Sequence, residues 1–400
     1  MQRIIYFTNS AWFLYSYRLN LMLAMKSRGV EVIAAAPWEN EYARQFEHHG
    51  IRFHDVPVQM WSVNPLAEIR VVLRMLQLIR QEQPIALHSF ALKAITNGSI
   101  AAHLAGVPVI INTFTGLGHT FLNEGLVKSI VIGLLRVALI SPAWAIFQNP
   151  EHQSLFHNLN LARDRSTVIL GSGIDTDRFS PPLEKDSSQS SNGKVTFLMF
   201  SKLIWSKGVR EYVEASKLLQ MRLRVKGRED YVRCILLGGA RKGNPTGVHP
   251  EWLGHPDSVP DEWLEDFAAK GDVEWLPHDE DILPHIHRAD VVVLPSYTEG
   301  LPRSLLEAMS CGKPIITTDI PGCREAVEDG VNGLLVPTKD VGSLTDAMLT
   351  LAEDEDLRKQ MGHASRKRVM TLFSDNHVIE KTLNVYNQAG LIIGAHQSQK

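Results

Sequence analysis

The segment that decides the fold is Pro295-Ser-Tyr-Thr-Glu299-Gly300-Leu301-Pro302-Arg303-Ser-Leu-Leu-Glu307-Ala-Met309, within a longer stretch that runs from 290 to 337. The residues before it, Asp290-Val-Val-Val-Leu294, are apolar and β-branched, which predicts a buried strand. The residues after Pro302 favour a helix. The segment therefore predicts a strand, a tight turn and the start of a helix.

This predicted turn suits an anion. The first turn of a helix leaves backbone N–H groups without partners, and the helix dipole favours negative charge there. Gly300 permits close approach, and Pro302 fits the first helical turn because it has no N–H to leave unpaired. Glu299 and Glu307 would flank the anion, which suits a ligand with hydroxyls on both sides of a diphosphate, such as a nucleotide sugar. For an isolated pair of glutamates, solvated helix surface is the alternative.

Length and composition limit the classes of protein. Four hundred residues suit two α/β domains, and a net charge of −3 gives no overall attraction to nucleic acid. The three cysteines lack zinc spacing and cannot all pair, which favours free thiols in a reducing cytoplasm. The first residues carry no signal-peptide pattern. The most apolar stretch, 126–147, contains charged residues and a proline and is a poor membrane span.

The N-terminal half alternates between strand and helix patterns. Residues 3–8 predict a strand, 9–16 a loop, 17–28 a helix and 30–36 a second strand. The Gly-rich loop of a dinucleotide site is absent after the first strand, where Asn9 and an aromatic run stand instead, so an NAD site is disfavoured. The alternation continues to about residue 148, with helices predicted at 65–82 and 92–105, and it predicts a parallel sheet with helices on both faces.

The C-terminal half repeats this architecture. A Ser-rich polar run at 184–192 predicts a linker. Strands are predicted to begin at about 194, 232, 272, 290 and 314, and helices near 340–353, 356–372 and 377–389 close the chain.

Several features in this order resemble the retaining glycosyltransferases of family 4, which have the GT-B fold. They are the two Rossmann-like halves, Gly171-Ser-Gly-Ile-Asp175-Thr-Asp-Arg178-Phe179, Ser201-Lys202-Leu-Ile-Trp-Ser-Lys207-Gly208, and two glutamates eight residues apart at 299 and 307. The resemblance covers nearly the whole chain.

Within that family the chain is most similar to bacterial N-acetylgalactosaminyl and related transferases that extend sugars on an undecaprenyl-diphosphate carrier. The sequence motifs that resemble that subgroup are Tyr15-Ser-Tyr-Arg-Leu19, Thr115-Gly-Leu-Gly118, Gly243-Asn-Pro245, 299–307 and Asp319-Ile-Pro-Gly-Cys-Arg-Glu325.

The resemblance implies an α/β chain with two Rossmann-like domains that face a central cleft. Residues 1–170 would form the acceptor domain, 171–193 the linker and 194–372 the nucleotide-sugar domain. A helix at 373–390 would pack back on the N-terminal domain.

The resemblance also assigns roles on the donor side. Glu307 would hold the ribose hydroxyls, and Glu299 with the amides of 300–303 would face the donor hexose and the diphosphate. Lys202 and Lys207 would neutralise the leaving nucleoside diphosphate. The family usually has Arg where this chain has Lys202, which keeps the charge but loses the bidentate fork. A plain surface turn is the alternative for Lys207. The further donor-side residues are Gly300, Leu301, Pro302, Arg303, Gly238, Gly239, Leu276, His278 and Ile282.

A histidine commonly ends a strand of the N-terminal domain in this family and contacts the donor sugar. Thr115 or Gly116 aligns with it here, and His119 follows a few residues later; a solvated histidine is the alternative for His119. The predicted acceptor-side residues are Asn9, Tyr15, Arg18, Thr115 and Gly116.

Two patterns invite a metal interpretation. Asp175-Thr-Asp177 matches the Asp-x-Asp of another glycosyltransferase fold, but its place beside a glycine turn favours turn formation by the aspartate side chains. The stretch from His278 to Asp281, and His285 with His287, favour a loop and a first helical turn. We therefore predict no metal and no cofactor.

The predicted function is metal-independent, retaining transfer of a sugar, an N-acetylhexosamine, from a UDP-sugar to a polyprenyl-diphosphate-linked saccharide in cell-surface glycan synthesis. In the family's usual account the acceptor attacks from the front face, and the leaving phosphate takes its proton. Three alternatives remain open: a transferase with a soluble acceptor, a UDP-N-acetylglucosamine 2-epimerase, and a non-catalytic subunit of a glycan-assembly complex.

The expected location is the cytoplasm, peripheral on the inner face of the cytoplasmic membrane. The helix at 126–140, with Lys128 and Arg136, and the upstream Arg70, Arg74 and Arg80 would dock on an anionic membrane. The alternative is a core helix with two snorkelling cations. The sequence gives no oligomeric state.

Overall fold

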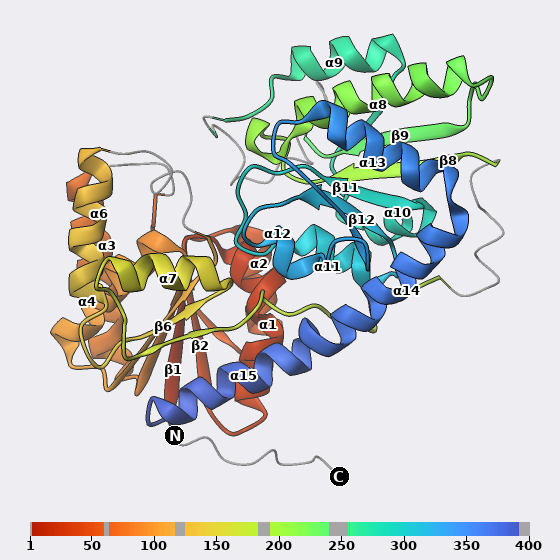
Figure 1. Cartoon of the computed structure of the whole chain (residues 1–400). Coiled ribbons are helices and arrows are strands. Elements are labelled where there is room, and N and C mark those ends of the chain that lie inside the picture. Colours follow the sequence, from red (N-terminus) through yellow and green to blue (C-terminus); the bar gives the residue numbers. More distant parts are fainter. Residues whose placement is uncertain are drawn as a thin grey trace. The chain divides into compact units, whose positions relative to one another are not determined.

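The computed structural model describes residues 2–59, 64–116, 125–182, 193–239, 255 and 257–391. The chain divides into two compact units. Unit 1 comprises Met1–Gly173 and Asp375–Lys400, and unit 2 comprises Ile174–Ser374 (Figure 1).

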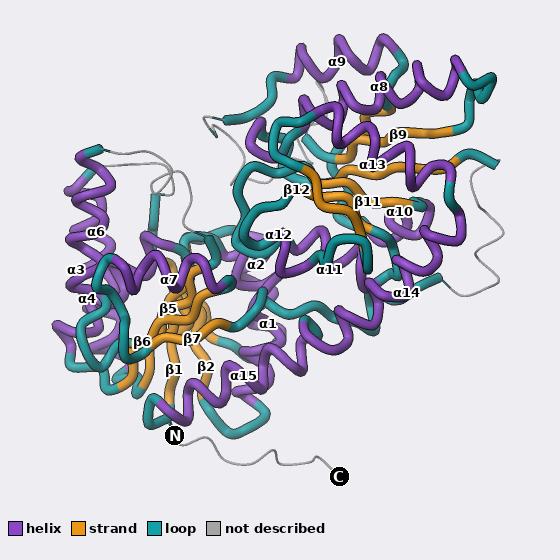
Figure 2. The backbone as a smooth tube through the Cα atoms, in the orientation of Figure 1, coloured by secondary structure: helices purple, strands orange, loops and turns teal. Residues whose placement is uncertain are grey.

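Unit 1 is built on a parallel sheet, drawn in orange in Figure 2. Seven strands are described in it: β1 (Arg3–Phe7), β2 (Glu31–Ala36), β3 (Arg52–Asp55), β4 (Ala86–Phe90), β5 (Val109–Phe114), β6 (Trp144–Phe147) and β7 (Ser166–Val168). Their order is β3-β2-β1-β4-β5-β6-β7, and Ile5 of β1 pairs with Ile33 of β2 and Leu87 of β4. The order reverses between β1 and β4, as in doubly wound folds.

Helices cover both faces of this sheet. They are α1 (Ala11–Lys26), α2 (Asn40–His48), α3 (Pro65–Glu82), α4 (Leu92–Ala105), α6 (Leu126–Ala138), α7 (Pro150–Asn158) and α15 (Asp375–Gln388). Because successive strand residues point to opposite faces, Ile4 and Tyr6 pack with the helices α1 and α15, whereas Ile5 and Phe7 pack with α3 and α4. Both faces are therefore apolar, which explains the continuous apolar strands.

The first helix departs from the prediction. A loop was expected at 9–16, but α1 begins at Ala11, so that the aromatic run lies in its first turns. The Ser10 side chain accepts the N–H of Phe13 at 3.1 Å, and the Glu39 carboxylate accepts the N–H groups of Ala11 and Trp12 at 2.9 and 2.8 Å. Glu39 thereby fills the anion-binding end of α1 with the protein's own charge.

The helix predicted to return to the N-terminal half is α15, and it packs on α1 within unit 1 (Figure 1). The Tyr386 hydroxyl hydrogen-bonds to the Tyr6 hydroxyl at 3.0 Å and to His88 Nδ1 at 2.6 Å. His88 Nε2 lies 2.7 Å from the Thr113 hydroxyl. Burial lowers the pKa of His88 well below its usual value, so this interior network is neutral.

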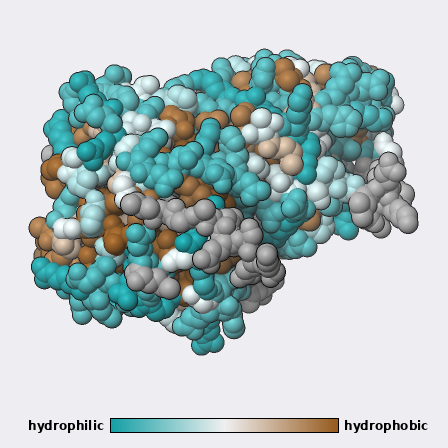
Figure 3. Space-filling model, turned by 90° about the horizontal axis from the view of Figure 1, so that it is seen from below, coloured by the Kyte–Doolittle hydropathy of each residue, from teal (hydrophilic) through white to brown (hydrophobic). Residues whose placement is uncertain are grey.

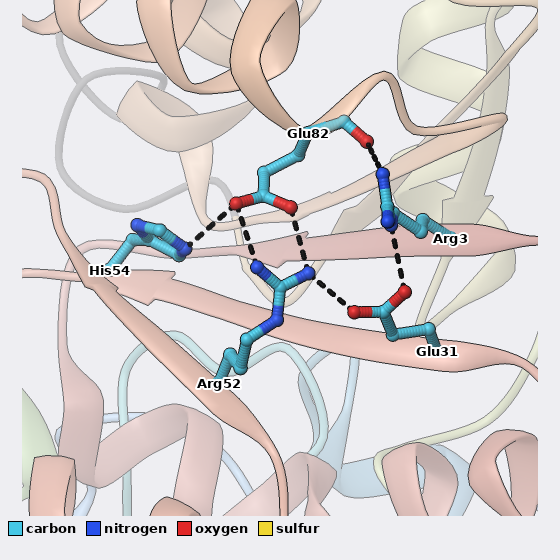
Figure 4. Close-up of polar contacts among 5 residues, drawn as sticks. All are labelled: Arg3, Glu31, Arg52, His54 and Glu82. Atoms are coloured by element: carbon cyan, nitrogen blue, oxygen red, sulfur yellow. Dashed lines mark hydrogen bonds and ion pairs between the residues drawn. The ribbon is translucent and has the colours of Figure 1, made fainter.

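A cluster of charged residues lies at the amino ends of the unit 1 strands (Figure 4). Arg52 donates to both carboxylate oxygens of Glu82 at 2.8 and 2.7 Å, and to Glu31 at 2.5 Å. Arg3 donates to Glu31 and to the carbonyl of Glu82. Hydrogen bonds from Arg3 and then Arg52 hold the pKa of Glu31 below its usual value. Ligands of parallel sheets bind at the carboxyl ends, so this cluster serves stability.

We expect Glu82→Gln to lower the free energy of unfolding by about 1–3 kcal/mol, since a buried carboxylate with a bidentate partner is lost. The side chain of Glu82 is 5% exposed. Urea-induced unfolding measures the change. The matched control is Glu274→Gln in unit 2, whose pair with Arg233 is 42–43% exposed and contributes about 0–1 kcal/mol. Equal losses in the two variants would contradict this assignment.

Unit 2 has the same architecture. Its described strands are β8 (Val195–Phe200), β9 (Val232–Leu237), β10 (Glu274–Leu276), β11 (Val291–Leu294), β12 (Ile315–Thr318) and β13 (Gly333–Val336), all parallel, in the order β10-β9-β8-β11-β12-β13. Its helices are α8 (Val209–Val225), α9 (Asp261–Lys270), α10 (Leu283–Arg288), α11 (Arg303–Ser310), α12 (Cys323–Ala326), α13 (Val341–Glu353) and α14 (Glu355–Leu372).

The junction between the units differs from the predicted linker. The chain passes from unit 1 to unit 2 at Gly173, and Arg366 donates to the carbonyls of Thr176 and Phe179 at 3.0 Å each. The described residues 174–182 thus belong to unit 2, and the Ser-rich run lies outside the described residues. Asp175 accepts the N–H groups of Asp177 and Arg178 at 3.0 and 2.9 Å, which is the predicted aspartate turn.

Candidate functional site

The donor-side residues predicted from the sequence gather at one edge of the unit 2 sheet. The strand order reverses between β8 and β11, and the carboxyl ends of these strands form the switch point at which doubly wound sheets bind ligands. Lys202 and Lys207 follow β8, and 295–303 follows β11. The sheet thus brings together segments that lie about ninety residues apart in sequence.

The two turns at the switch point are in direct contact. The N–H of Tyr297 donates to the carbonyl of Ser206 at 2.8 Å. Gly208 has φ +76°, and a Cβ placed there would lie 2.1 Å from the carbonyl oxygen of Pro295. Only glycine permits this conformation and this approach.

The Lys207 ammonium and the Glu299 carboxylate form an ion pair across these turns. The Ser296 hydroxyl donates to the same carboxylate oxygen, Oε1, at 2.7 Å. The Glu299 side chain is 9% exposed and that of Lys207 is 20% exposed, so the pair is largely shielded from water. Both groups are therefore held at defined positions beside the start of α11.

A third turn closes against this pair. Gly322, which precedes α12, would place a Cβ 2.5 Å from the carbonyl oxygen of Gly300 and 3.1 Å from Cβ of Glu299. Pro302 is the N-cap of α11, and the helix begins at Arg303, one residue later than predicted. Gly300, Leu301 and Pro302 are buried in this arrangement.

Glu307 lies one turn into α11. Arg303 Nε donates to its carboxylate at 2.9 Å, and the side chain of Glu307 is 14% exposed. Burial raises the pKa of Glu307, against the opposing influence of Arg303 and Arg178. A carboxylate in this setting has lone pairs that ligand hydroxyls can satisfy.

The remaining donor-side residues are joined by backbone hydrogen bonds at the neighbouring strand ends. The N–H of Gly238 donates to the carbonyl of Leu276 at 3.0 Å, and the N–H of His278 donates to the carbonyl of Gly239 at 2.9 Å. Burial lowers the pKa of His278. Ile282 is half-buried at the N-cap of α10.

Sequence reasoning missed one contact at this edge. The Tyr297 hydroxyl donates to Glu211 Oε1 at 2.6 Å, and Glu211, in the first turn of α8, is 7% exposed. Within the described residues, the other oxygen of Glu211 has no hydrogen-bond partner. Desolvation of Tyr297 and the hydrogen bond to Glu211 raise the Tyr297 pKa. No motif marks this pair, which lies 86 residues apart in sequence.

We expect Tyr297→Phe to lower kcat about tenfold, because the turn that carries Glu299 loses its tether to α8 and small displacements cost rate. Steady-state kinetics measure the change. The control is Tyr231→Phe, an exchange in the same unit beside Arg228. A kcat within twofold of the unsubstituted protein would remove the positioning role of Tyr297.

The predicted acceptor-side residues of unit 1 are less concentrated. Asn9 follows β1, and Thr115 and Gly116 follow β5, at the carboxyl edge of the sheet. Tyr15 is half-buried and packs against Phe46. Arg18 is buried, with its guanidinium 4.5 Å from the ring centre of Phe90. His119 lies outside the described residues.

Within the described residues, no group of three metal-ligating side chains is close enough to hold an ion. His285 Nε2 pairs with Asp279 at 2.9 Å at the start of α10. Cys234, Cys311 and Cys323 are free and buried, and burial raises the pKa of each thiol to about 12. Unreactive core thiols are the result.

Two protein families match the chain. "Glycosyl transferases group 1" matches residues 182–368, and "Glycosyl transferase 4-like" matches residues 3–141. Together the two matches span most of both units.

Individual relatives match over nearly the whole chain. The N,N'-diacetylbacillosaminyl-diphospho-undecaprenol alpha-1,3-N-acetylgalactosaminyltransferase of Campylobacter jejuni is 26% identical, covering 96% of this chain and 98% of the relative. The capsular polysaccharide biosynthesis glycosyltransferase CapM of Staphylococcus aureus is 25% identical, over 84% of each chain.

Solved structures share the fold. The structure of Anabaena Alr3699/HepE in complex with UDP-glucose superposes with a TM-score of 0.76 at 19% identity, covering 97% of this chain and 100% of that one. Three observations indicate the same protein family: the two parallel-sheet units, the position of the glutamates at the carboxyl edge of the sheet, and the family matches. The chain belongs to the GT-B glycosyltransferases, with a glycosyltransferase 4-like segment in unit 1 and a group 1 domain in unit 2.

Proposed function

We propose that the protein transfers a sugar, an N-acetylhexosamine, from a UDP-sugar to a saccharide linked to a polyprenyl diphosphate. The observation that carries the proposal is the shielded Lys207–Glu299 pair at the switch point of unit 2, beside α11 and Glu307. The relative from Campylobacter and the UDP-Gal:alpha-D-GlcNAc-diphosphoundecaprenol alpha-1,3-galactosyltransferase of Escherichia coli, 23% identical over 84% of each chain, support the choice of acceptor.

In this proposal the donor binds at the carboxyl edge of unit 2. Glu307 accepts hydrogen bonds from the ribose hydroxyls, and the N–H groups at the start of α11 face the diphosphate. Lys207 and Lys202 stabilise the charge that develops on the diphosphate when the glycosidic bond breaks. The ion pair keeps the Lys207 ammonium in position until the diphosphate competes for it, and Glu299 then faces the hexose.

The acceptor belongs to unit 1 in this proposal. Its hydroxyl oxygen forms the new bond to the anomeric carbon, the bond from that carbon to the diphosphate breaks, and the hydroxyl proton passes to a phosphate oxygen of the departing UDP. Because the acceptor attacks from the same face that the diphosphate leaves, the anomeric configuration is retained. Glu39 already occupies the N–H groups at the start of α1, so we do not assign a phosphate to that helix end.

The first experiment is protection against thermal unfolding by UDP, GDP and their sugars. A ligand that binds only the folded state raises the unfolding temperature, and we expect UDP and UDP-N-acetylhexosamines to do so more than GDP-sugars. The second is UDP release after addition of a lipid-linked saccharide, in buffer with EDTA. Release that requires the acceptor and persists in EDTA supports metal-independent transfer, whereas an epimeric UDP-sugar formed without acceptor would indicate an epimerase instead.

A further inference from the structure

Two helices of unit 1 expose apolar side chains at helical spacing. They are Leu66, Ile69 and Leu73 on α3, and Ile130, Leu134 and Val137 on α6, all two-fifths to two-thirds exposed. We call these six side chains the α3/α6 apolar face. The spacing places each trio on one side of its helix.

The two helices belong to one layer. α3 packs on α4, and α4 packs on α6, so all three cover the sheet together. Figure 3 shows apolar residues, in brown, at the surface of the left-hand part of the molecule, which is unit 1. The inward side of α6 is occupied by Leu135 and Ala138, which are buried. The outward side of α6, by contrast, is exposed.

The charge of this layer is opposite to that of the chain. α3, α4 and α6 carry six cationic residues, Arg70, Arg74, Arg80, Lys93, Lys128 and Arg136, but only two acidic ones, whereas the whole chain has a net charge of −3. Both acidic residues are engaged: Glu68 pairs with Lys93 and Glu82 with Arg52. Exposed apolar side chains among cations are the signature of helices that lie in the interface of an anionic bilayer.

We propose that the α3/α6 apolar face docks on an anionic membrane, with Arg70 and Arg136 placed among the lipid headgroups. Within the described residues, no helix is both long and apolar enough to cross a bilayer, so this contact is peripheral. The choice of a membrane over another partner rests on the proposed function, since a polyprenyl diphosphate is embedded in one. The cations set the preference for anionic lipid, and the six apolar side chains supply attraction that salt does not screen.

The test is sedimentation of the full chain with vesicles. We expect binding at least about tenfold tighter to phosphatidylcholine with about 30% phosphatidylglycerol than to phosphatidylcholine alone, with partial loss at about 0.5 M salt. Ile130→Glu should weaken binding about tenfold or more, because a carboxylate enters the interface.

The matched control is Met221→Glu on α8 of unit 2. Ile130 and Met221 are 53% and 52% exposed. Arg222 and Arg224, which follow Met221 closely in the sequence, already pair with acidic residues. Equal weakening by both variants, or no sedimentation of the unsubstituted protein, overturns the proposal. A dimer that Ile130→Glu dissociates while vesicle binding persists would assign the face to a second copy of the chain instead.

Activity separates this inference from the proposed function. With acceptor dissolved in detergent, Ile130→Glu should turn over like the unsubstituted protein, and with acceptor in vesicles it should be slower by the factor lost in binding. If the unsubstituted protein released no UDP under either condition, the proposed function would be wrong. The membrane proposal would then be decided by vesicle binding alone.

Discussion

Lys207→Met should lower kcat by about 10²–10³, because a cation held beside the departing diphosphate stabilises charge that is largest in the transition state. Glu299, which also accepts a hydrogen bond from Ser296, positions the Lys207 ammonium before any ligand arrives, so little reorganisation is required. Steady-state UDP release measures the change. Affinity for the donor should fall far less, since the charge on the ground-state diphosphate is more dispersed.

The matched control for this variant is Lys194→Met. Lys194 lies just before β8, at the amino ends of the strands of the same sheet, and it pairs with Asp230 at 3.3 Å. We expect its kcat to stay within twofold. If Lys207→Met kept turnover within threefold while circular dichroism showed an intact fold, the switch point of unit 2 would not be where the diphosphate leaves.

Glu307→Gln should weaken UDP binding about 10–100-fold, since charge-assisted hydrogen bonds to ribose are replaced by neutral ones. Calorimetry measures the affinity. Inorganic diphosphate serves as the ligand control because it lacks ribose, and its binding should be unchanged. Equal effects on UDP and on diphosphate would place Glu307 in the phosphate part of the site.

The same residue predicts a pH dependence. Burial raises the pKa of Glu307, so its carboxylate takes up a proton at a higher pH than an ordinary glutamate as the solution is acidified. This protonation stabilises the free folded protein as pH falls through the raised pKa, and it removes an acceptor for the ribose hydroxyls. UDP affinity should therefore decline on acidification, and Glu307→Gln should flatten that decline. If UDP affinity depended on pH identically in the two proteins, the Glu307 carboxylate would not be the group that causes the decline.

Most of the fold follows from the sequence because apolar strands alternate with helical patterns at regular spacing. α3 and α4 have the predicted bounds. The start of α1 was missed because half of its cap is Glu39, which is 28 residues distant from Ala11 and invisible to a local pattern. α7 and β7 were missed because they are short and partly polar.

The local arrangement of the predicted donor-side residues followed from the sequence for a similar reason. Glu299, Gly300 and Glu307 belong to one strand–turn–helix segment whose chemistry is local. The sheet topology that brings Lys207 to Glu299 is non-local, and it was reached only through family resemblance. The Tyr297–Glu211 contact had no such guide, because each residue alone is ordinary and only the packing of two turns makes them partners.

The return of α15 to unit 1 has a consequence for the order of folding during synthesis. Val378, Leu383 and Tyr386 complete the apolar layer around Ile4 and Tyr6, yet the ribosome makes them only after every residue of unit 2. Until then a nascent chain carries an uncovered sheet face on its first half, while unit 2 is contiguous and can close on its own. The unit made first is thus the last to be finished, and release of the segment that forms α15 from the ribosome becomes the step that completes unit 1.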